Sequence, residues 1–336
     1  MKETKMKLTV EQIRALTKGA VRVFEEDGGV CFRRFTEEQE RLYSQVSNDF
    51  YGKTYATAGV RLELVTDSRS LAMTYSASSS SSRRYFNCDI TVNGELVCAL
   101  GEHLDSVPNK KPVVSGGCEL GEGEKKVVVY FPWSASLKLI SFELDDGASV
   151  TPIERPVKMI MFGDSITHGY DAANPSLSYA SLLTDALNAE SINKGIGGEI
   201  FRPQLAMARD SFEPHIITVA YGTNDWGVFA SKEQFDAACE GFYSELSKAY
   251  PDARIYAMTP IWRGDYKKTT RVGEFGYIAQ KIKEVAESLP NVEAVDCFGF
   301  IPQDPQLFSY DTLHPVSSGF RYYAEALVER IANKKA

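Results

Sequence analysis

The chain has 336 residues, of which 43% are hydrophobic and 24% are charged, and its formal net charge is −8 at pH 7. This length favours two domains, and no apolar run approaches the roughly 20 residues that a membrane-spanning helix needs. The acidic balance argues against a nucleic-acid partner, because phosphate binding draws on clustered Lys and Arg. No apolar signal core follows the N-terminal residues, so we expect a cytoplasmic protein without a membrane partner.

Six cysteines are scattered through the chain, without a CxxC pair and without histidines at metal-ligand spacing: Cys31, Cys88, Cys98, Cys118, Cys239 and Cys297. This pattern predicts buried thiols, although the even count leaves disulfides open. We expect no metal ion and no cofactor. The sequence leaves the oligomeric state open.

Short alternating or β-branched runs predict strands at 60–65, 71–75, 85–92, 95–100, 126–131 and 137–144. Asn93-Gly94 between two of them predicts a two-residue hairpin, because a type I′ turn needs positive φ at both central positions. The small polar residues of 76–82 predict a flexible exposed loop without chemistry. We therefore expect residues 1–153 to form a β-sandwich domain of jelly-roll type.

After residue 153 the pattern changes to strands that alternate with helices. An apolar run at 157–162 ends in a glycine turn, and helical spacing follows at 179–187. The same unit recurs with strands at 216–221, 254–258 and 292–297 and helices at 232–249, 271–288 and 317–331. This alternation predicts a parallel sheet covered by helices on both faces, in a second domain at 154–336.

A serine follows the first strand of this second domain, in the segment Gly163-Asp164-Ser165. Open α/β sheets place their sites at such strand ends, where Ser165 would present its hydroxyl. Alone, the segment equally fits a helix N-cap. Position 167 is Thr rather than Gly, so this is not the G-x-S-x-G elbow of the α/β-hydrolases.

Two later segments offer hydrogen-bond donors at strand ends. The Gly-Ile-Gly-Gly sequence at 195–198 allows backbone N–H groups to point into a site, or it forms a plain turn. Asn224, just after the strand at 216–221, offers a neutral amide to a developing oxyanion, or it forms an Asx turn.

A histidine near the C-terminus has a carboxylate at short turn spacing. Asp311 lies three residues before His314, just ahead of the last predicted helix. This carboxylate could hold the imidazole tautomer while the other ring nitrogen faces a serine. A lone histidine is more often structural. We expect His168 to be a neighbour of Ser165 on the rim of the site rather than its base.

In this order, the four segments resemble the SGNH (GDSL) hydrolase superfamily over the whole second domain, about 180 residues. The resemblance implies an esterase with a flavodoxin-like three-layer domain and strand order 2-1-3-4-5. It implies these roles: nucleophile Ser165, acid Asp311, base His314, and oxyanion donors Ser165, Gly198 and Asn224. The second segment departs from the usual family pattern at Glu199, so Gly197 stays open as the alternative to Gly198.

A β-sandwich ahead of such a domain further resembles the two-domain carbohydrate esterases of family two, which remove acetyl groups from sugars. The substrate implied is a short-chain acyl ester, first of all an acetyl ester, of a carbohydrate or similar small molecule, cleaved through an acyl-enzyme. A lysophospholipase or thioesterase, and a non-catalytic carbohydrate-binding protein, stay open as alternatives. Trp226 and Trp262 could line the substrate pocket or pack within loops.

Overall fold

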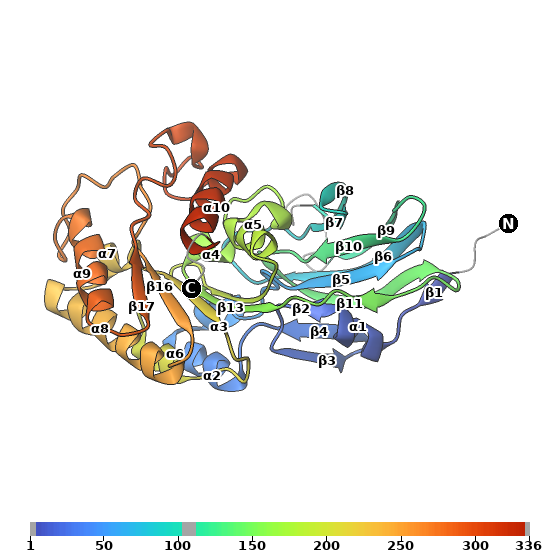
Figure 1. Cartoon of the computed structure of the whole chain (residues 1–336), viewed down its shortest axis with the longest axis horizontal. Coiled ribbons are helices and arrows are strands. Elements are labelled where there is room, and N and C mark those ends of the chain that lie inside the picture. Colours follow the sequence, from blue (N-terminus) through green and yellow to red (C-terminus); the bar gives the residue numbers. More distant parts are fainter. Residues whose placement is uncertain (1–4, 103–111, 333–336) are drawn as a thin grey trace.

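The computed structural model describes residues 5–102 and 112–332 of the chain. A β-rich half with two six-stranded sheets and an α/β half with a five-stranded sheet lie end to end along the long axis of the molecule (Figure 1). Within the described ranges, no helix is long and apolar enough to cross a membrane.

The first sheet of the β-rich half has the strand order β3-β4-β11-β6-β9, with β1 paired to β11. All of its pairs are antiparallel. Its strands are β1 (Lys5–Lys7), β3 (Arg22–Glu26), β4 (Gly29–Arg33), β6 (Ser70–Ser79), β9 (Val113–Glu119) and β11 (Ala135–Asp145).

The second sheet has the order β12-β5-β10-β7-β8, with β2 paired to β5. Its strands are β2 (Thr17–Lys18), β5 (Arg61–Thr66), β7 (Cys88–Val92), β8 (Glu95–Leu100), β10 (Lys125–Tyr130) and β12 (Thr151–Pro152). Alternate residues of both sheets, together with helix α1 (Val10–Leu16), fill one shared core. The expected sandwich is confirmed, and all six predicted strands are present.

The Asn-Gly hairpin is confirmed, because Asn93 and Gly94 have φ values of 51° and 89° between β7 and β8. The predicted loop at 76–82 is wrong in its first part. Ser76 to Ser79 continue strand β6 and pair with β11, where Ala77 lies opposite Leu137. Pairing with a neighbouring strand and burial of Ala77 override the weak strand preference of serine.

The α/β half has the strand order β14-β13-β15-β16-β17, and every pair in it is parallel. Its strands are β13 (Val157–Gly163), β14 (Ala189–Gly195), β15 (Ile216–Ala220), β16 (Arg254–Met258) and β17 (Val292–Val295). In chain order this is 2-1-3-4-5, as the resemblance implied. The flavodoxin-like arrangement is therefore confirmed.

Helices cover both faces of this sheet. Helices α8 (Lys232–Ala249) and α9 (Phe275–Glu287) bury their apolar sides in one core, and α5 (Tyr179–Ala186) and α10 (Ser317–Ala332) bury theirs in the other. Shorter helices occupy loops of this half: α4 (Ser165–His168), α6 (Pro203–Met207), α7 (Asp225–Val228), and the 3₁₀ segments η2 (Pro175–Leu177) and η3 (Pro305–Leu307). The result is a three-layer sandwich of helices, sheet and helices.

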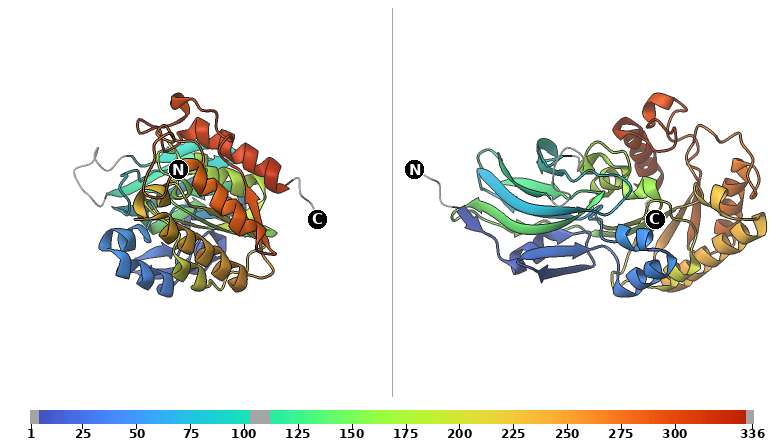
Figure 2. Two further views of the ribbon diagram at one scale, coloured as in Figure 1. Left: turned by 90° about the vertical axis from the view of Figure 1, so that its left-hand side faces the viewer. Right: turned by 180° about the vertical axis from the view of Figure 1, so that it is seen from behind.

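Part of the N-terminal segment belongs physically to the α/β half. Helices α2 (Glu37–Val46) and α3 (Asn48–Lys53) lie beside this half in all three ribbon views (Figures 1 and 2). Phe35 and Tyr43 are buried in the core under α8 and α9. A division of the chain at residue 153 remains a prediction, and excision at that point would expose this core.

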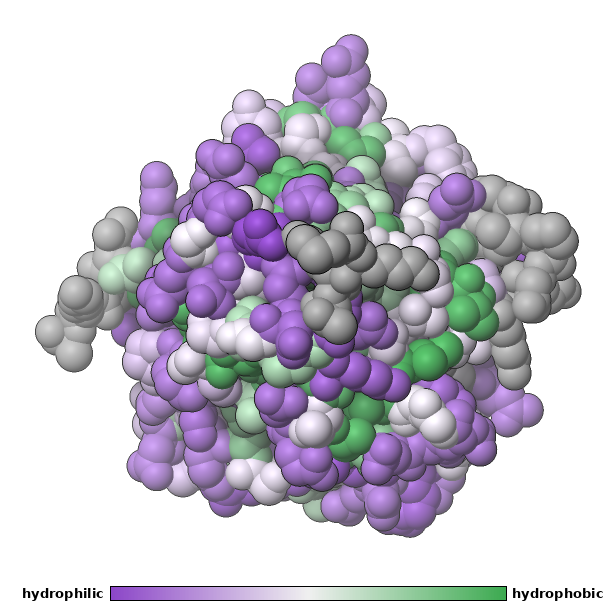
Figure 3. Space-filling model, turned by 90° about the vertical axis from the view of Figure 1, so that its right-hand side faces the viewer, coloured by the Kyte–Doolittle hydropathy of each residue, from purple (hydrophilic) through white to green (hydrophobic). Residues whose placement is uncertain are grey.

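The end of the β-rich half that lies farthest from the α/β half has a mainly hydrophilic surface, with hydrophobic residues scattered over it (Figure 3). Scattered apolar residues are normal on a globular protein. All six cysteines are free thiols, and four of them are buried, as the sequence predicted; Cys98 and Cys118 are half-buried.

Candidate active site

Ser165 lies where strand β13 ends and the short helix α4 begins. Asp164 caps this helix, because its Oδ1 accepts the Ile166 N–H at 2.9 Å. A side chain at position 163 would overlap the side chain of Thr167, so close packing requires Gly163. The glycine turn expected here is present, and Gly163 does not have a positive φ. The turn therefore depends on close packing rather than on unusual backbone geometry.

Three side chains far apart in the sequence form one chain of hydrogen bonds. His314 Nε2 lies 2.8 Å from Ser165 Oγ, and His314 Nδ1 lies 2.6 Å from Asp311 Oδ2. A carboxylate can only accept, so Nδ1 carries the proton and Nε2 is free to accept from the serine hydroxyl. Both Ser165 and His314 are buried. The structure thus brings together the three residues predicted as nucleophile, base and acid.

Asp311 is held in its ionised form by the turn that contains it. Its Oδ1 accepts from the backbone N–H of Leu313 at 2.9 Å, from that of His314 at 3.1 Å, and from Ser309 Oγ at 2.8 Å. Burial alone would raise the pKa of Asp311, but these bonds and the one from the His314 ring lower it well below its usual value. A permanent negative charge therefore faces Nδ1 of the imidazole.

One N–H group of the glycine loop after β14 has no acceptor among the described residues. The Gly197 N–H donates to His168 Nδ1 at 3.3 Å, so it is already engaged inside the protein. Gly198 is exposed and has a φ of 89°. Within residues 5–102 and 112–332, no protein group accepts its N–H. The geometry therefore favours Gly198 over Gly197 as an oxyanion donor, and the choice itself remains a prediction.

Asn224 is tied to the same loop. Its Nδ2 donates to the Glu199 carbonyl at 3.0 Å, which engages one of the two amide hydrogens. The neighbouring Asp225 is fully buried and accepts the N–H groups of Phe201 and Gly222, each at 2.8 Å. Burial raises the pKa of Asp225 to about 7. These bonds fix the loop that carries Asn224 next to the glycine loop.

His168 does not lie on the rim of the site, where we expected it, but is buried. It is only 1% exposed and lies beneath the glycine loop. Its Nε2 lies 2.8 Å from the Trp133 carbonyl, which can only accept a proton, so the ring carries its hydrogen on Nε2. Burial lowers the pKa of His168 well below its usual value, which keeps this ring neutral.

A second carboxylate, which was not predicted from the sequence, lies beside His314. Asp171 Oδ2 lies 3.7 Å from His314 Nδ1, and Asp171 has a φ of 67°, which is uncommon for a residue other than glycine. Arg83, from the segment that follows strand β6 of the sandwich, binds Asp171 through two bonds of 2.7 and 3.0 Å. Nothing in the local sequence of either residue signals this contact, because 88 positions separate them.

Asp171, Asp311 and His314 place three potential metal-ligand atoms within 4.8 Å of one another. The imidazole and the Arg83 guanidinium already supply hydrogens to the two carboxylates. A metal ion would have to displace these bonds. The absence of a metal site remains a prediction.

The two tryptophans lie inside the fold. Trp226 is 2% exposed, donates to the Gly273 carbonyl at 2.8 Å and packs against Phe275. Trp262 is 7% exposed and packs against Phe308, with ring centroids 5.0 Å apart. This burial favours loop packing, the second of the two interpretations above, and a role of either ring in substrate binding remains a prediction.

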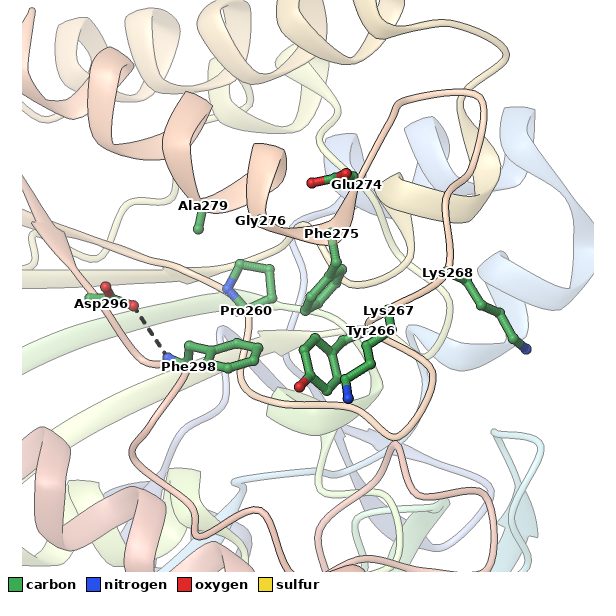
Figure 4. A pocket seen from close by; sticks show the side chains of 10 residues that line it. All are labelled: Pro260, Tyr266, Lys267, Lys268, Glu274, Phe275, Gly276, Ala279, Asp296 and Phe298. Atoms are coloured by element: carbon green, nitrogen blue, oxygen red, sulfur yellow. Dashed lines mark hydrogen bonds between the residues drawn. The ribbon is translucent and has the colours of Figure 1, made fainter.

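A pocket of about 550 Å³ opens over the ends of strands β16 and β17 (Figure 4). Aromatic and apolar side chains form part of its wall, among them Pro260, Tyr266, Phe275 and Phe298, and lysines and carboxylates form the rest. None of the predicted site residues lines it. The pocket lies at the same edge of the parallel sheet as Ser165, because the strands share one direction.

The fold and the Ser-His-Asp arrangement are those that the resemblance to the SGNH hydrolases implied. Residues 161–322 match the model of the GDSL-like Lipase/Acylhydrolase family. The α/β half of this chain therefore matches that family in sequence, as the motifs implied.

One curated relative is cellulase/esterase CelE of Acetivibrio thermocellus, which is 26% identical to this chain over 264 residues. The match covers 66% of this chain and 31% of that protein. This chain thus spans about a third of the length of the curated relative that it matches.

Two solved structures match nearly the whole chain. The salicylyl-acyltransferase SsfX3 of a tetracycline biosynthetic pathway is 21% identical, with a TM-score of 0.84, over 98% of this chain and 97% of that one. A family two carbohydrate esterase from Clostridium thermocellum, solved with cellohexaose, is 18% identical, with a TM-score of 0.65, over 94% and 98%. At these identities the matches show a shared fold over nearly the whole chain.

Proposed function

We propose that this protein is a serine esterase that cleaves a short-chain acyl ester, first of all an acetyl ester, of a carbohydrate or similar small molecule. The observation that carries the proposal is the unbroken hydrogen-bond chain from Ser165 Oγ through His314 to Asp311. A serine hydroxyl is a poor nucleophile at neutral pH and needs such a base.

In the first half of the reaction, His314 Nε2 takes the hydroxyl proton while Ser165 Oγ attacks the ester carbonyl carbon. Asp311 stabilises the imidazolium that forms and keeps Nδ1 protonated. The tetrahedral intermediate then collapses, His314 returns the proton to the alcohol oxygen, and the acyl group stays on Ser165.

The negative oxygen of the tetrahedral intermediate needs donors that are already in place. We assign this role to the backbone N–H groups of Ser165 and Gly198 and to the second amide hydrogen of Asn224. The Asn224 bond to the Glu199 carbonyl supports this assignment, because it places the amide next to the glycine loop. All three donors are uncharged.

In the second half, His314 takes a proton from the water that attacks the acyl carbon. The bond from that carbon to Ser165 Oγ then breaks, His314 returns the proton to Oγ, and the carboxylic acid leaves. An alcohol in place of water would give acyl transfer, the activity that the name of the matched salicylyl-acyltransferase states. The identity of that match is 21%, so the fold alone is shared. We therefore favour water as the acceptor and test the alcohol directly.

The carbohydrate assignment is supported by the fold that this chain shares, over nearly its whole length, with a family two carbohydrate esterase. The two alternatives make different predictions. A lysophospholipase or thioesterase would prefer long acyl chains or thioesters across a series of p-nitrophenyl esters and acyl thioesters. A non-catalytic carbohydrate-binding protein would bind sugars but leave a fluorophosphonate probe unreacted.

The testing experiment measures hydrolysis of p-nitrophenyl acetate and of a panel of acetylated sugars by the full chain and by the Ser165→Ala variant. We expect turnover by the parent chain and loss to the uncatalysed rate in the variant. Release of the acetyl group as an alcohol ester, with added alcohol present, would identify a transferase. Unchanged turnover in Ser165→Ala would refute the proposal.

A further inference from the structure

The peptide between Gly197 and Gly198 needs to be held in one orientation if it is to serve the oxyanion. Glycine populates positive and negative φ about equally, so a Gly-Gly peptide can rotate at little cost. Rotation would turn the Gly198 N–H away and bring the Gly197 carbonyl oxygen toward the reacting centre. That oxygen would repel the negative charge that develops there.

A lysine from the N-terminal segment holds this peptide. Lys53 lies at the end of helix α3, 144 positions before Gly197, and its Nζ donates to the Gly197 carbonyl at 3.0 Å. Lys53 is 8% exposed, and its second partner is Asp49 on the same helix, with Nζ 2.5 Å from the carboxylate. Burying an ammonium group costs free energy unless the group is paired. The Lys53 ammonium therefore needs the two protein acceptors that it binds in place of water.

The preceding peptide is fixed from the other side. The Gly197 N–H donates to Nδ1 of the neutral His168 ring. The Phe50 ring, also from α3, would contact a side chain at position 198 at 3.7 Å, so it borders the same loop. Gly197 is thereby held at both its N–H and its carbonyl, and Gly198 is the first residue of the loop that faces outward.

We propose that Lys53 is a positioning residue of the oxyanion hole, which fixes the Gly197–Gly198 peptide so that the Gly198 N–H faces the tetrahedral intermediate. This inference rests on the proposed function. The positive charge on the carbonyl oxygen also polarises the peptide, which makes its N–H a stronger donor, because linked hydrogen bonds strengthen one another. Helix α3 of the N-terminal segment thus completes a site whose reacting residues all lie beyond residue 160.

The test is the Lys53→Met variant, which keeps the length of the side chain and removes its charge and donors. Removal of an oxyanion donor costs roughly 100- to 1000-fold in rate, and Lys53 acts through such a donor, so we expect kcat on p-nitrophenyl acetate to fall about 10- to 100-fold. KM should stay within about twofold, because the bond matters for the intermediate and not for the bound ester.

A matched control is available in the sandwich. Lys125 is also buried and also donates from its ammonium group to backbone carbonyls, those of Ser68 and Gly121. Lys125→Met should lower the melting temperature to a similar extent as Lys53→Met and leave kcat unchanged. Equal losses of kcat in the two variants would show a purely structural effect and overturn the inference.

A second readout separates positioning from general damage. Phenylboronic acid forms a tetrahedral adduct on a catalytic serine, and its affinity should fall by the same factor as kcat in Lys53→Met. If the affinity stays that of the parent chain while kcat falls, the inference is wrong. If Lys53→Met does not fold, Lys53→Gln, a neutral donor, should lose activity about 3- to 10-fold, and full activity in it would refute the inference.

The activities of Lys53→Met and Ser165→Ala together distinguish a wrong role for Lys53 from a wrong esterase mechanism. Parent-like kcat in Lys53→Met, with activity abolished in Ser165→Ala, would refute the role of Lys53 alone. Activity that survives in Ser165→Ala would refute the esterase mechanism and this inference together.

Discussion

At the scale of single residues, the site around Ser165 contains one ionised carboxylate, Asp311, and one histidine that is kept neutral, His168. Asp311 accepts four hydrogen bonds, and its pKa is held far below its usual value by the bonds that outweigh its burial. His168, three residues after the serine, is kept neutral by burial. The ionised carboxylate therefore faces the imidazole of His314, and the neutral ring supports the glycine loop.

We predict that Asp311→Asn lowers kcat by about 100- to 10,000-fold, because the amide presents a hydrogen to Nδ1 in place of a charge and favours the wrong tautomer. The measurement is steady-state hydrolysis of p-nitrophenyl acetate. Asp67→Asn is the control, since Asp67 also accepts a backbone N–H but lies in the sandwich. A kcat within threefold of the parent in Asp311→Asn would show that Asp311 is not the acid.

Asn224→Ala should lower kcat/KM by about 100- to 1000-fold, the usual cost of removing one oxyanion donor. The bond to the Glu199 carbonyl is lost as well, so the melting temperature is measured alongside. Asn224→Asp removes the donor hydrogens but keeps the size of the side chain, and it should be at least as inactive. Activity in the aspartate variant at the parent level would remove Asn224 from the oxyanion hole.

At the scale of elements, the turn from β13 into α4 carries both the predicted nucleophile, Ser165, and a buried carboxyl group, Asp164, that affects stability. Asp164 caps α4 from a fully buried position. Burial raises its pKa to about 7, although the hydrogen bond from the Ile166 N–H lowers it; the smaller effects of Asp225, which raises it, and of Arg263, which lowers it, oppose each other. A carboxyl group of this kind binds its proton more tightly in the folded chain than in the unfolded one.

The raised pKa of Asp164 makes the free energy of unfolding depend on pH. Between the unfolded pKa near 4 and the folded pKa of about 7, the folded state holds the Asp164 proton and the unfolded state does not, so the free energy of unfolding falls as the pH rises. Asp164→Asn keeps the cap and should flatten this slope by up to about 1.4 kcal/mol per pH unit. Urea unfolding at pH 5 and pH 7 measures it, and an unchanged slope would contradict the prediction.

Most strands and the longer helices of the α/β half could be predicted, because short apolar runs alternate there with stretches of helical spacing. The predicted bounds of α8 and β16 match the observed ones. The serine-rich end of β6 could not be predicted, because its backbone pairs with β9 and β11, which lie far along the chain. The intrinsic strand preference of a residue is a weak guide where strands distant in sequence supply its hydrogen-bond partners.

The reacting residues were predictable for a different reason: Ser165, Asn224 and His314 each lie in a short segment at the end of a strand or just before a helix. Their supporting groups are not in those segments. Arg83 and Lys53 reach the site from 88 and 144 positions away, and neither has a local signature. Contacts of this range depend on how the two halves fit together.

At the scale of the whole molecule, the two halves meet at the site. The Trp133 carbonyl binds His168, and Arg83 binds Asp171 beside His314. Both contacts come from the sandwich side of the predicted boundary. The N-terminal half is therefore part of the environment of the catalytic histidine rather than a separate attachment.

We predict that Arg83→Ala lowers kcat about 10-fold, because Asp171 would lose its partner and become an uncompensated charge beside the His314–Asp311 pair. Arg83→Lys should be intermediate, since lysine keeps the charge but cannot bind both carboxylate oxygens in the fork geometry of arginine. Circular dichroism verifies the fold of both variants. Full activity in Arg83→Ala would show that the sandwich contact is purely structural.

The central claim is that Ser165 is the nucleophile and His314 its base. The most direct test treats the full chain with a fluorophosphonate and locates the adduct by peptide mass spectrometry. The account predicts an adduct on Ser165, much slower labelling in His314→Ala, and none in Ser165→Ala. Labelling of the Ser165→Ala variant at the parent rate, or an adduct on another residue of the parent chain, would contradict it.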